Sequence, residues 1–336
     1  AGTLAARRSI AEPAAPEASP PRARSMGDML DFDELHVEFA TDLVPMILDP
    51  ATGLDTRIAN IRNHVAAAFG LILPEIRLTD DGALPPGTYR IRIQGVEQVR
   101  DRLLPDHVLA LAPDDAAPLP DGEDVHEPVY GVAARWIRSD LHEEASLRGL
   151  TVVTPTEVLA THLLEVIKAN MARLLTLRGL RRLLDEFTNL SDPQRSEANR
   201  RLLDELVPDK VPPDLLLSVL RLLLDERVSV RNLPLILEAI AELRNLAAAP
   251  ETVCEHVRRR LSFQLVAELR RPDGSVPLVQ LAPEWESLFA RYQIEGERGQ
   301  QDVALPPDQF NRLAAALGDR LAEIAGQGGS VALVTS

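Results

Sequence analysis

Few residues in this chain have the types and spacing that catalysis requires, and His162 is the strongest candidate. It follows Thr161 inside a helical pattern, where an imidazole could serve as a general base. No nucleophile or oxyanion motif accompanies it, and the seven histidines include no His-Glu-x-x-His spacing for zinc. We therefore interpret His162 as a structural or surface histidine. A hydrolase that uses it remains a distant alternative.

The other candidate chemistry is equally sparse. Cys254 is the only cysteine, which excludes an internal disulfide and a cysteine-based zinc site, and nothing around it indicates an activated thiol. Residues 103–134 contain seven carboxylates and no Lys or Arg, but they lack the ligand spacing and turn glycine of an EF-hand, so we interpret them as a solvated acidic loop. There is no Walker loop and no dinucleotide-binding fingerprint. The sequence predicts no cofactor, no metal and no enzyme activity.

Composition and charge exclude further classes. The chain has 336 residues, a net charge of −15 and 45% apolar residues, an ordinary balance for two to four folding units. Nucleic acid and anionic membrane surfaces are disfavoured because a negative surface repels phosphates. No apolar run approaches the roughly 18 residues that span a bilayer, and no signal peptide is recognisable. The chain also lacks an initiator Met, so we expect it to be a piece of a longer protein.

The elements that would position these residues follow from local patterns. Residues 1–32 are rich in Ala and Pro and are predicted to be a linker. Ile58 to Phe69 shows helical periodicity, with Gly70 at the C-cap. Tyr89 to Ile93 alternates with arginines, which predicts a half-buried strand with its cationic face in water. Runs 108–112 and 132–137 predict strands that frame the acidic loop, and a helix and strands this close indicate an α+β unit.

The second half of the chain is predicted to be mostly helical. Thr154, Pro155 and Glu157 form a capping-box pattern, and helices should continue to about residue 270. Mixed structure returns after that: a strand near 276–281, a helix after Pro307 and a strand over 331–334. No partner strand follows the last one, which again suggests that the natural protein continues.

Several segments, in the right order between residues 33 and 270, resemble the FlhA family of flagellar type III export-gate proteins. The segments are Pro86-Gly87-Thr88-Tyr89-Arg90-Ile91, Pro128-Val129-Tyr130-Gly131, Ala134-Arg135-Trp136-Ile137, Gly149-Leu150-Thr151-Val152-Val153, Val158-Leu159-Ala160-Thr161-His162-Leu163, Leu206-Val207-Pro208 and Val228-Ser229-Val230-Arg231-Asn232-Leu233. Homologues in virulence injectisomes share much of this set. We favour the flagellar branch and keep an injectisome export gate as the alternative.

The resemblance implies an α+β fold of several subdomains below a membrane half that this chain lacks. The first subdomain would be split, over residues 33–105 and 155–174, with a small sheet-containing second subdomain inserted at 106–154. A helical third subdomain would cover 175–253, and an incomplete α/β fourth subdomain would cover 254–336. The acidic stretch of residues 103–134, which was found independently of this resemblance, falls on the second subdomain.

The resemblance also implies a function. The family receives export chaperones loaded with substrates in a cleft between the first two subdomains, and passes the cargo to the export channel. The family's acid, aromatic and threonine correspond to Glu127, Tyr130 and Thr161, although the family commonly has Asp and Phe at the first two positions. The apolar floor of the cleft would be formed by Leu109, Leu111, Pro113 and Val153.

Assembly is implied in the same way. Family members form a nine-membered ring in which the linker binds a neighbouring subunit, and the linker supplies Met29, Leu30 and Phe32 as apolar anchors here. Other expected partners belong to the export apparatus and include the export ATPase complex. The domain is expected on the cytoplasmic face of the bacterial inner membrane, tethered only through the absent half.

Overall fold

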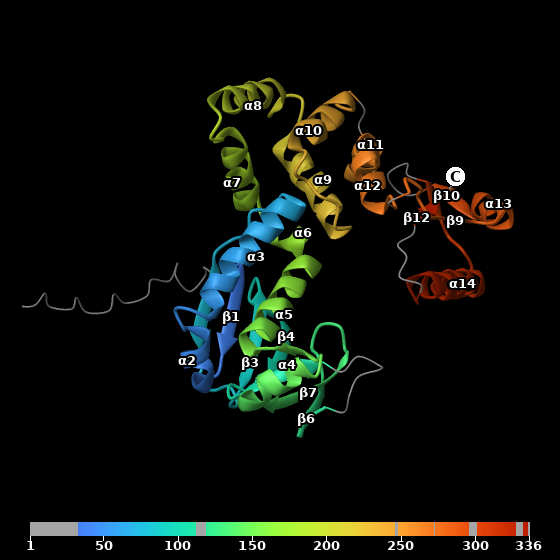
Figure 1. Cartoon of the computed structure of the whole chain (residues 1–336). Coiled ribbons are helices and arrows are strands. Elements are labelled where there is room, and N and C mark those ends of the chain that lie inside the picture. Colours follow the sequence, from blue (N-terminus) through green and yellow to red (C-terminus); the bar gives the residue numbers. More distant parts are fainter. Residues whose placement is uncertain are drawn as a thin grey trace, which may run out of the picture.

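The computed structural model describes residues 33–111, 119–245, 248–271, 273–295, 301–326 and 332–334. Its helices and strands form an α+β fold (Figure 1). Among the described residues, the strands form two four-stranded sheets and two two-stranded sheets. The predicted α+β class is therefore confirmed. No helix in these ranges combines the length and the apolar character needed to cross a bilayer.

The first sheet has the strand order β2-β1-β3-β4, with β1 parallel to β2 and antiparallel to β3. Its strands are β1 Leu35–Phe39, β2 Ile76–Asp80, β3 Thr88–Ile93 and β4 Val96–Arg102. A 3-10 turn, η1 Thr41–Leu43, and a short helix, α2 Val44–Ile47, follow β1. The long helices α3 (Leu54–Phe69) and α5 (Pro155–Ala169) lie in front of the sheet in Figure 1.

Strand β3 is confirmed, but its arginine face is not in water as predicted. Arg90 lies directly opposite Glu38 in the antiparallel register of β1 and β3. It forms an ion pair with Glu38 and a second one with Asp81, at 2.9 Å between Nη2 and Oδ2. Arg92 also approaches Glu38, at 3.4 Å. The prediction failed because the partner of this face comes from a distant strand, and cross-strand pairs of opposite charge stabilise each other.

The second sheet has the order β6-β7-β5-β8, with antiparallel neighbours throughout. Its strands are β5 His107–Leu111, β6 Gly122–His126, β7 Ala133–Arg138 and β8 Thr151–Val153; η2 Ser139–Leu141 and α4 His142–Leu147 connect β7 to β8. Alternate side chains of β5 face two different cores. Val108 and Ala110 pack in a small cluster with Ala145 of α4, whereas Leu109 belongs to the main cluster. The sheet is thus sandwiched between α4 and the rest of the molecule.

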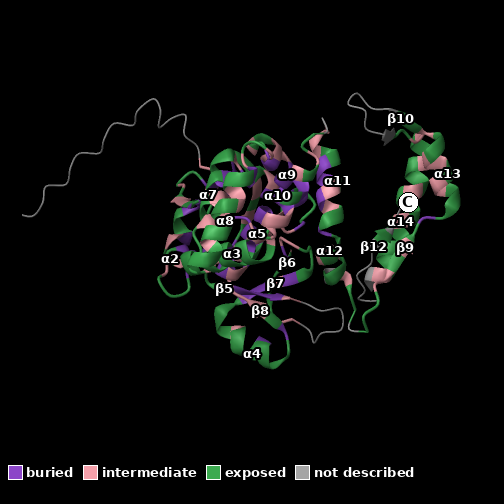
Figure 2. Cartoon of the chain, turned by 90° about the horizontal axis from the view of Figure 1, so that it is seen from above, coloured by how far each residue is buried: buried purple, intermediate pink, exposed green. Residues whose placement is uncertain are grey.

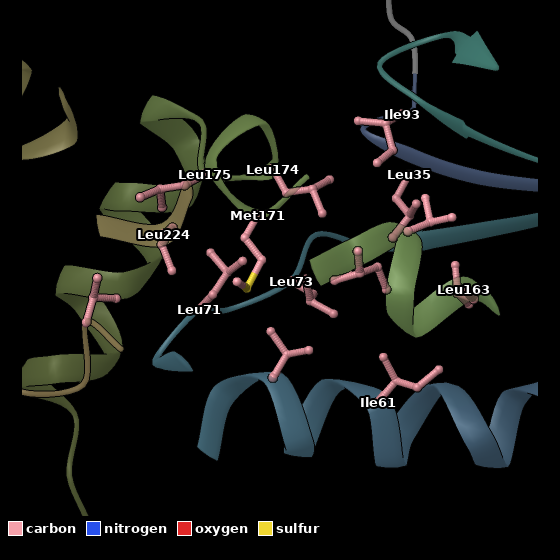
Figure 3. Packing of buried hydrophobic residues seen from close by; sticks show 14 of the residues in the cluster. Leu35, Ile61, Leu71, Leu73, Ile93, Leu163, Met171, Leu174, Leu175 and Leu224 are labelled. Carbon is pink, nitrogen blue, oxygen red and sulfur yellow. The ribbon is translucent and has the colours of Figure 1, made fainter. Parts of the chain in front are cut away.

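Helices follow the second sheet, as predicted. They are α6 Met171–Leu174, α7 Leu177–Thr188, α8 Pro193–Leu206, α9 Pro213–Asp225, α10 Leu233–Glu242, α11 Pro250–Arg260 and α12 Ser262–Leu269. Prolines occupy the first turn of several of them, where the missing N–H costs nothing. Their core is continuous with that of the first sheet: Figure 3 shows Leu35 and Ile93 from the sheet in one cluster with Met171 and Leu224.

Gly70 allows α3 to meet the helical part closely. Its φ of 75° ends α3 in the left-handed conformation, as the sequence predicted. Immediately before it, the Phe69 carbonyl accepts a hydrogen bond from the Val230 N–H at 2.8 Å. A Cβ atom at position 70 would lie 2.7 Å from the backbone nitrogen of Arg231. Glycine is therefore required here both for the backbone conformation and for the close approach.

The C-terminal elements lie beside α11 and α12 and are largely exposed (Figures 1 and 2). They are β9 Leu278–Gln280, α13 Pro283–Arg291, β10 Gln293–Glu295, β11 Gln301–Val303, α14 Pro307–Gly326 and β12 Ala332–Val334. The expectation that the last strand lacks a partner was wrong, because β12 pairs in parallel with β9. The subdomain boundary expected at residue 254 falls inside α11, whose Val253 and Val257 pack in the main core.

Candidate functional site

A cleft of about 200 Å³ opens between α5, the second sheet and the turn that precedes β7. The aliphatic part of its lining comes from β5, β8, α5 and that turn. The side chains that line the cleft are Leu111, Glu127, Tyr130, Val132, Val153, Glu157, Val158 and Thr161. An apolar hollow with a few polar groups at its edge is suited to binding a complementary apolar side chain.

The capping box fixes the start of α5 beside the cleft. The Thr154 hydroxyl accepts a hydrogen bond from the Glu157 N–H at 3.3 Å, and the Thr154 N–H donates to Glu157 Oε2 at 2.8 Å. Arg57 on α3 donates to the other carboxylate oxygen at 3.1 Å. Burial acts to raise the pKa of Glu157, but the Thr154 hydrogen bonds and the Arg57 charge together outweigh it, so this pKa lies below its usual value.

The turn from Glu127 to Val132 presents Tyr130 at the cleft. The Glu127 N–H donates to the Val132 carbonyl at 2.8 Å, and the Gly131 N–H donates to the Glu127 carbonyl at 3.0 Å. The carboxylate of Glu127 accepts from two more amides of the turn, Val129 at 3.1 Å and Tyr130 at 2.7 Å. Glu127 is only 7% exposed, whereas Tyr130 is 69% exposed.

The structure brings five of the predicted site residues together at the cleft, namely Glu127, Tyr130, Thr161, Leu111 and Val153. It places Leu109 elsewhere: this side chain is fully buried and lines a neighbouring cavity of about 90 Å³ with Trp136 and Pro128. The predicted Pro113 of the cleft floor and the linker residues Met29, Leu30 and Phe32 lie outside the described residues.

Three lining residues were missed by the sequence analysis. Glu157 and Val158 precede Thr161 by four and three positions, so helical periodicity alone places them on the same face of α5. That signal was available in the sequence. Val132 had no comparable local signal, because its place in the cleft depends on how the turn folds back toward β7.

Within the part of the chain that the structure describes, the hydroxyls of Tyr130 and Thr161 make no hydrogen bond. Tyr130 does not pack under Trp136, since the tyrosine is largely exposed and Trp136 is only 5% exposed. Among the residues that the structure describes, the Thr161 hydroxyl has no hydrogen-bond partner, and the residue is exposed. These side chains therefore remain available to a binding partner.

His162 does not belong to the lining of the cleft, although it follows Thr161 on α5. It is 8% exposed, and its Nδ1 shares a hydrogen bond with the hydroxyl of Tyr89 at 2.6 Å. Burial lowers the pKa of His162, although the carboxylates of Asp101 and Glu127 act to raise it. Burial also raises the pKa of Tyr89 well above its usual value. The pair is thus neutral at physiological pH and joins β3 to α5.

Neither the thiol nor the possible metal ligands of the described residues indicate a second, catalytic or metal-binding site. Cys254 on α11 is buried, and burial raises the pKa of its thiol to about 11, the opposite of activation. Within the described ranges, no three His, Cys, Asp or Glu side chains gather as a metal site would require.

Comparison with solved structures shows which proteins share this fold. Solved proteins with the same fold include CdsV of Chlamydia pneumoniae, with a TM-score of 0.69 and 22% identity over 86% of this chain and 83% of that one. The same protein in complex with CdsO gives a TM-score of 0.66, with 22% identity over 86% of this chain and 85% of that one. The nonameric SctV-C of EPEC gives 0.63, with 16% identity over 90% of this chain and 93% of that one.

Sequence comparison identifies the family of this chain. The FHIPEP family matches residues 3–336, and this chain belongs to that family. The flagellar biosynthesis protein FlhA of Caulobacter vibrioides is 34% identical over 326 residues, which are 97% of this chain. The same match covers 45% of that relative, so the chain spans less than half of its length.

Proposed function

We propose that this chain is the docking domain of a flagellar type III export gate, and that it receives chaperone–substrate complexes in the cleft beside α5. The observation that carries the proposal is the exposed Tyr130 beside an aliphatic cleft of about 200 Å³. An exposed aromatic next to a small apolar hollow has the features of a binding hot spot. The family membership and the 34% identity to a flagellar FlhA favour the flagellar branch.

The geometry supports docking over turnover. Val153 and Val158 provide apolar walls on two different elements, so a partner's side chain would be enclosed from both sides. Thr161 adds a free hydroxyl at the edge, where it could receive one hydrogen bond. Truncation of an anchoring aromatic typically costs about 2 kcal/mol or more, which is roughly a 30-fold loss of affinity.

The test is a calorimetric titration of this chain with a flagellar chaperone–substrate complex from the same organism. The double variant Tyr130→Ala, Thr161→Ala should lose binding while its circular dichroism spectrum stays unchanged. Phe263→Ala is the matched control, because Phe263 is an aromatic side chain 60% exposed on α12, far along the chain from the cleft. Equal affinities of the parent and the double variant would refute docking at this cleft.

Assembly and partners form the second part of the proposal. The fold is shared with SctV-C, which is nonameric, and with CdsV, which has been solved in complex with CdsO. We infer that the whole protein forms a nonameric ring on the cytoplasmic face of the inner membrane and contacts other export-apparatus proteins, including the export ATPase complex. Residues 20–32 would anchor on the next subunit, and deleting them should weaken self-association in sedimentation velocity experiments.

Two alternatives give different results in the same titration. An injectisome gate would bind an injectisome chaperone complex and not the flagellar one. A hydrolase that uses His162 is poorly supported, because the ring is buried against Tyr89 and does not line the cleft. Such an enzyme would lose turnover in His162→Ala without any loss of chaperone binding.

A further inference from the structure

The carboxylate of Glu127 is engaged by its own turn. One oxygen, Oε2, accepts hydrogen bonds from the N–H groups of Val129 and Tyr130 at 3.1 and 2.7 Å. Hydrogen bonds to an ionised acceptor are about twice as strong as neutral ones. Glu127 is only 7% exposed and lines the cleft, and among the described residues its second oxygen, Oε1, has no hydrogen-bond partner.

Tyr130 depends on this turn for its position. Its side chain is 69% exposed, so few packing contacts hold the ring where it is. The backbone of the turn is closed by the Glu127 N–H to the Val132 carbonyl and by the Gly131 N–H to the Glu127 carbonyl. Gly131 sits at a φ of 66°, which a glycine adopts without steric cost. Two further amides of the turn, at positions 129 and 130, are bound by the carboxylate.

We propose that Glu127 is a positioning residue that acts through Tyr130 by holding the backbone of its turn. The carboxylate holds the backbone of residues 129 and 130, and this fixes where the exposed ring stands relative to Val132 and the cleft. The part of this inference that concerns binding rests on the proposed docking function. The part that concerns the turn can be measured on the chain alone.

The alternative of a direct ion pair with the partner is less consistent with the geometry. Two backbone amides already bind Oε2 of Glu127, so a partner's Lys or Arg could reach only the second oxygen, Oε1, on a residue that is 7% exposed. The carboxylate of Glu157 lines the same cleft and has a side chain 38% exposed, so it is the more accessible acid. It is already paired with Arg57 at 3.1 Å.

The first arm of the test uses the fact that the chain has three tyrosines. A chain labelled with 15N-tyrosine gives an amide signal for each, and the Tyr130 signal is assigned from its loss in Tyr130→Phe. We expect Glu127→Ala to speed exchange of the Tyr130 amide with water by about tenfold or more, as expected when a hydrogen bond to a charged group is lost. Glu127→Gln should stay within about threefold of the parent, because the amide oxygen still accepts.

The Tyr89 amide in β3 is the internal control and should exchange equally slowly in all variants. Faster exchange at both tyrosines would show global loosening and would overturn the inference. An unchanged Tyr130 rate in Glu127→Ala would also overturn it, since the carboxylate would then not be holding the turn.

The second arm is a double-mutant cycle on the binding of the flagellar chaperone–substrate complex. Glu127→Ala should lower the affinity of the parent chain for the complex. In the Tyr130→Ala background, the same change should lower the affinity by less than about twofold further. Glu127→Gln should retain most of the affinity. Glu143→Ala, which removes an exposed carboxylate on α4, is the charge-matched control and should change nothing.

The outcomes separate the two hypotheses. Additive losses, or a loss in Glu127→Gln as large as in Glu127→Ala, would show that the charge acts on the partner directly and would overturn the inference. If the parent chain binds no complex at all, the proposed docking function fails, while the exchange measurement still decides whether Glu127 holds Tyr130.

Discussion

Gly70→Ala should destabilise the protein far more than the same change at Gly95. Both glycines have a positive φ, 75° and 77°, so the alanine meets the same backbone penalty at each, about 1 to 2 kcal/mol. They differ in their surroundings. A Cβ at position 70 would lie 2.7 Å from the backbone nitrogen and 2.9 Å from the Cα of Arg231, whereas a Cβ at position 95 meets nothing within 4 Å.

The difference between the two variants isolates the close approach of α3 to the Arg231 segment. Overpacking a tight contact costs about 1 to 3 kcal/mol, so Gly70→Ala should lose about 2 to 5 kcal/mol in total and Gly95→Ala only about 1 to 2. Urea denaturation followed by far-ultraviolet circular dichroism measures both free energies of unfolding. Equal losses of the free energy of unfolding would refute the reasoning. They would show that the backbone at Arg231 moves aside at no cost, so that the contact between α3 and this segment does not require a glycine at position 70.

The remaining predictions concern the cleft, the buried histidine and the thiol. Val132→Trp should fill the cleft and reduce chaperone binding by about tenfold or more, whereas Val96→Trp, also at an exposed valine, should leave calorimetric affinity unchanged. Because burial lowers the pKa of His162 below its unfolded value of 6.5, the unfolded chain takes up this proton first. Stability should therefore be full above pH 6.5 and fall as the pH drops through it, with a shallower slope in His162→Gln in urea titrations. Cys254, with a pKa of about 11, should react with a disulfide reagent at pH 8 roughly 100-fold more slowly in the native state than in urea.

The location of the cleft was predictable from the sequence to a useful degree. Glu127, Tyr130 and Thr161 were selected through family motifs, and the structure gathers all three around one hollow. Their individual parts in it were not predictable. The resemblance placed the acid at 127 in the cleft, but it gave no indication that its carboxylate binds the amides of its own turn. Leu109 was assigned to the floor by the same motifs, yet it is fully buried in the main core, although it lies on the same face of β5 as Leu111, which does line the cleft.

Local features were determined by the sequence itself. The capping box at Thr154 and Glu157, the left-handed end of α3 at Gly70 and the alternation along β3 each involve residues within a few positions of one another, so neighbours in the chain suffice to specify them. The tertiary structure decided the features that need distant partners. Arg90 is withdrawn from water because β1 places Glu38 opposite it and Asp81 pairs with it as well, and the terminal strand β12 pairs with β9. Such pairings depend on which strands become neighbours when the core closes, and that is a property of the whole fold and not of any local pattern.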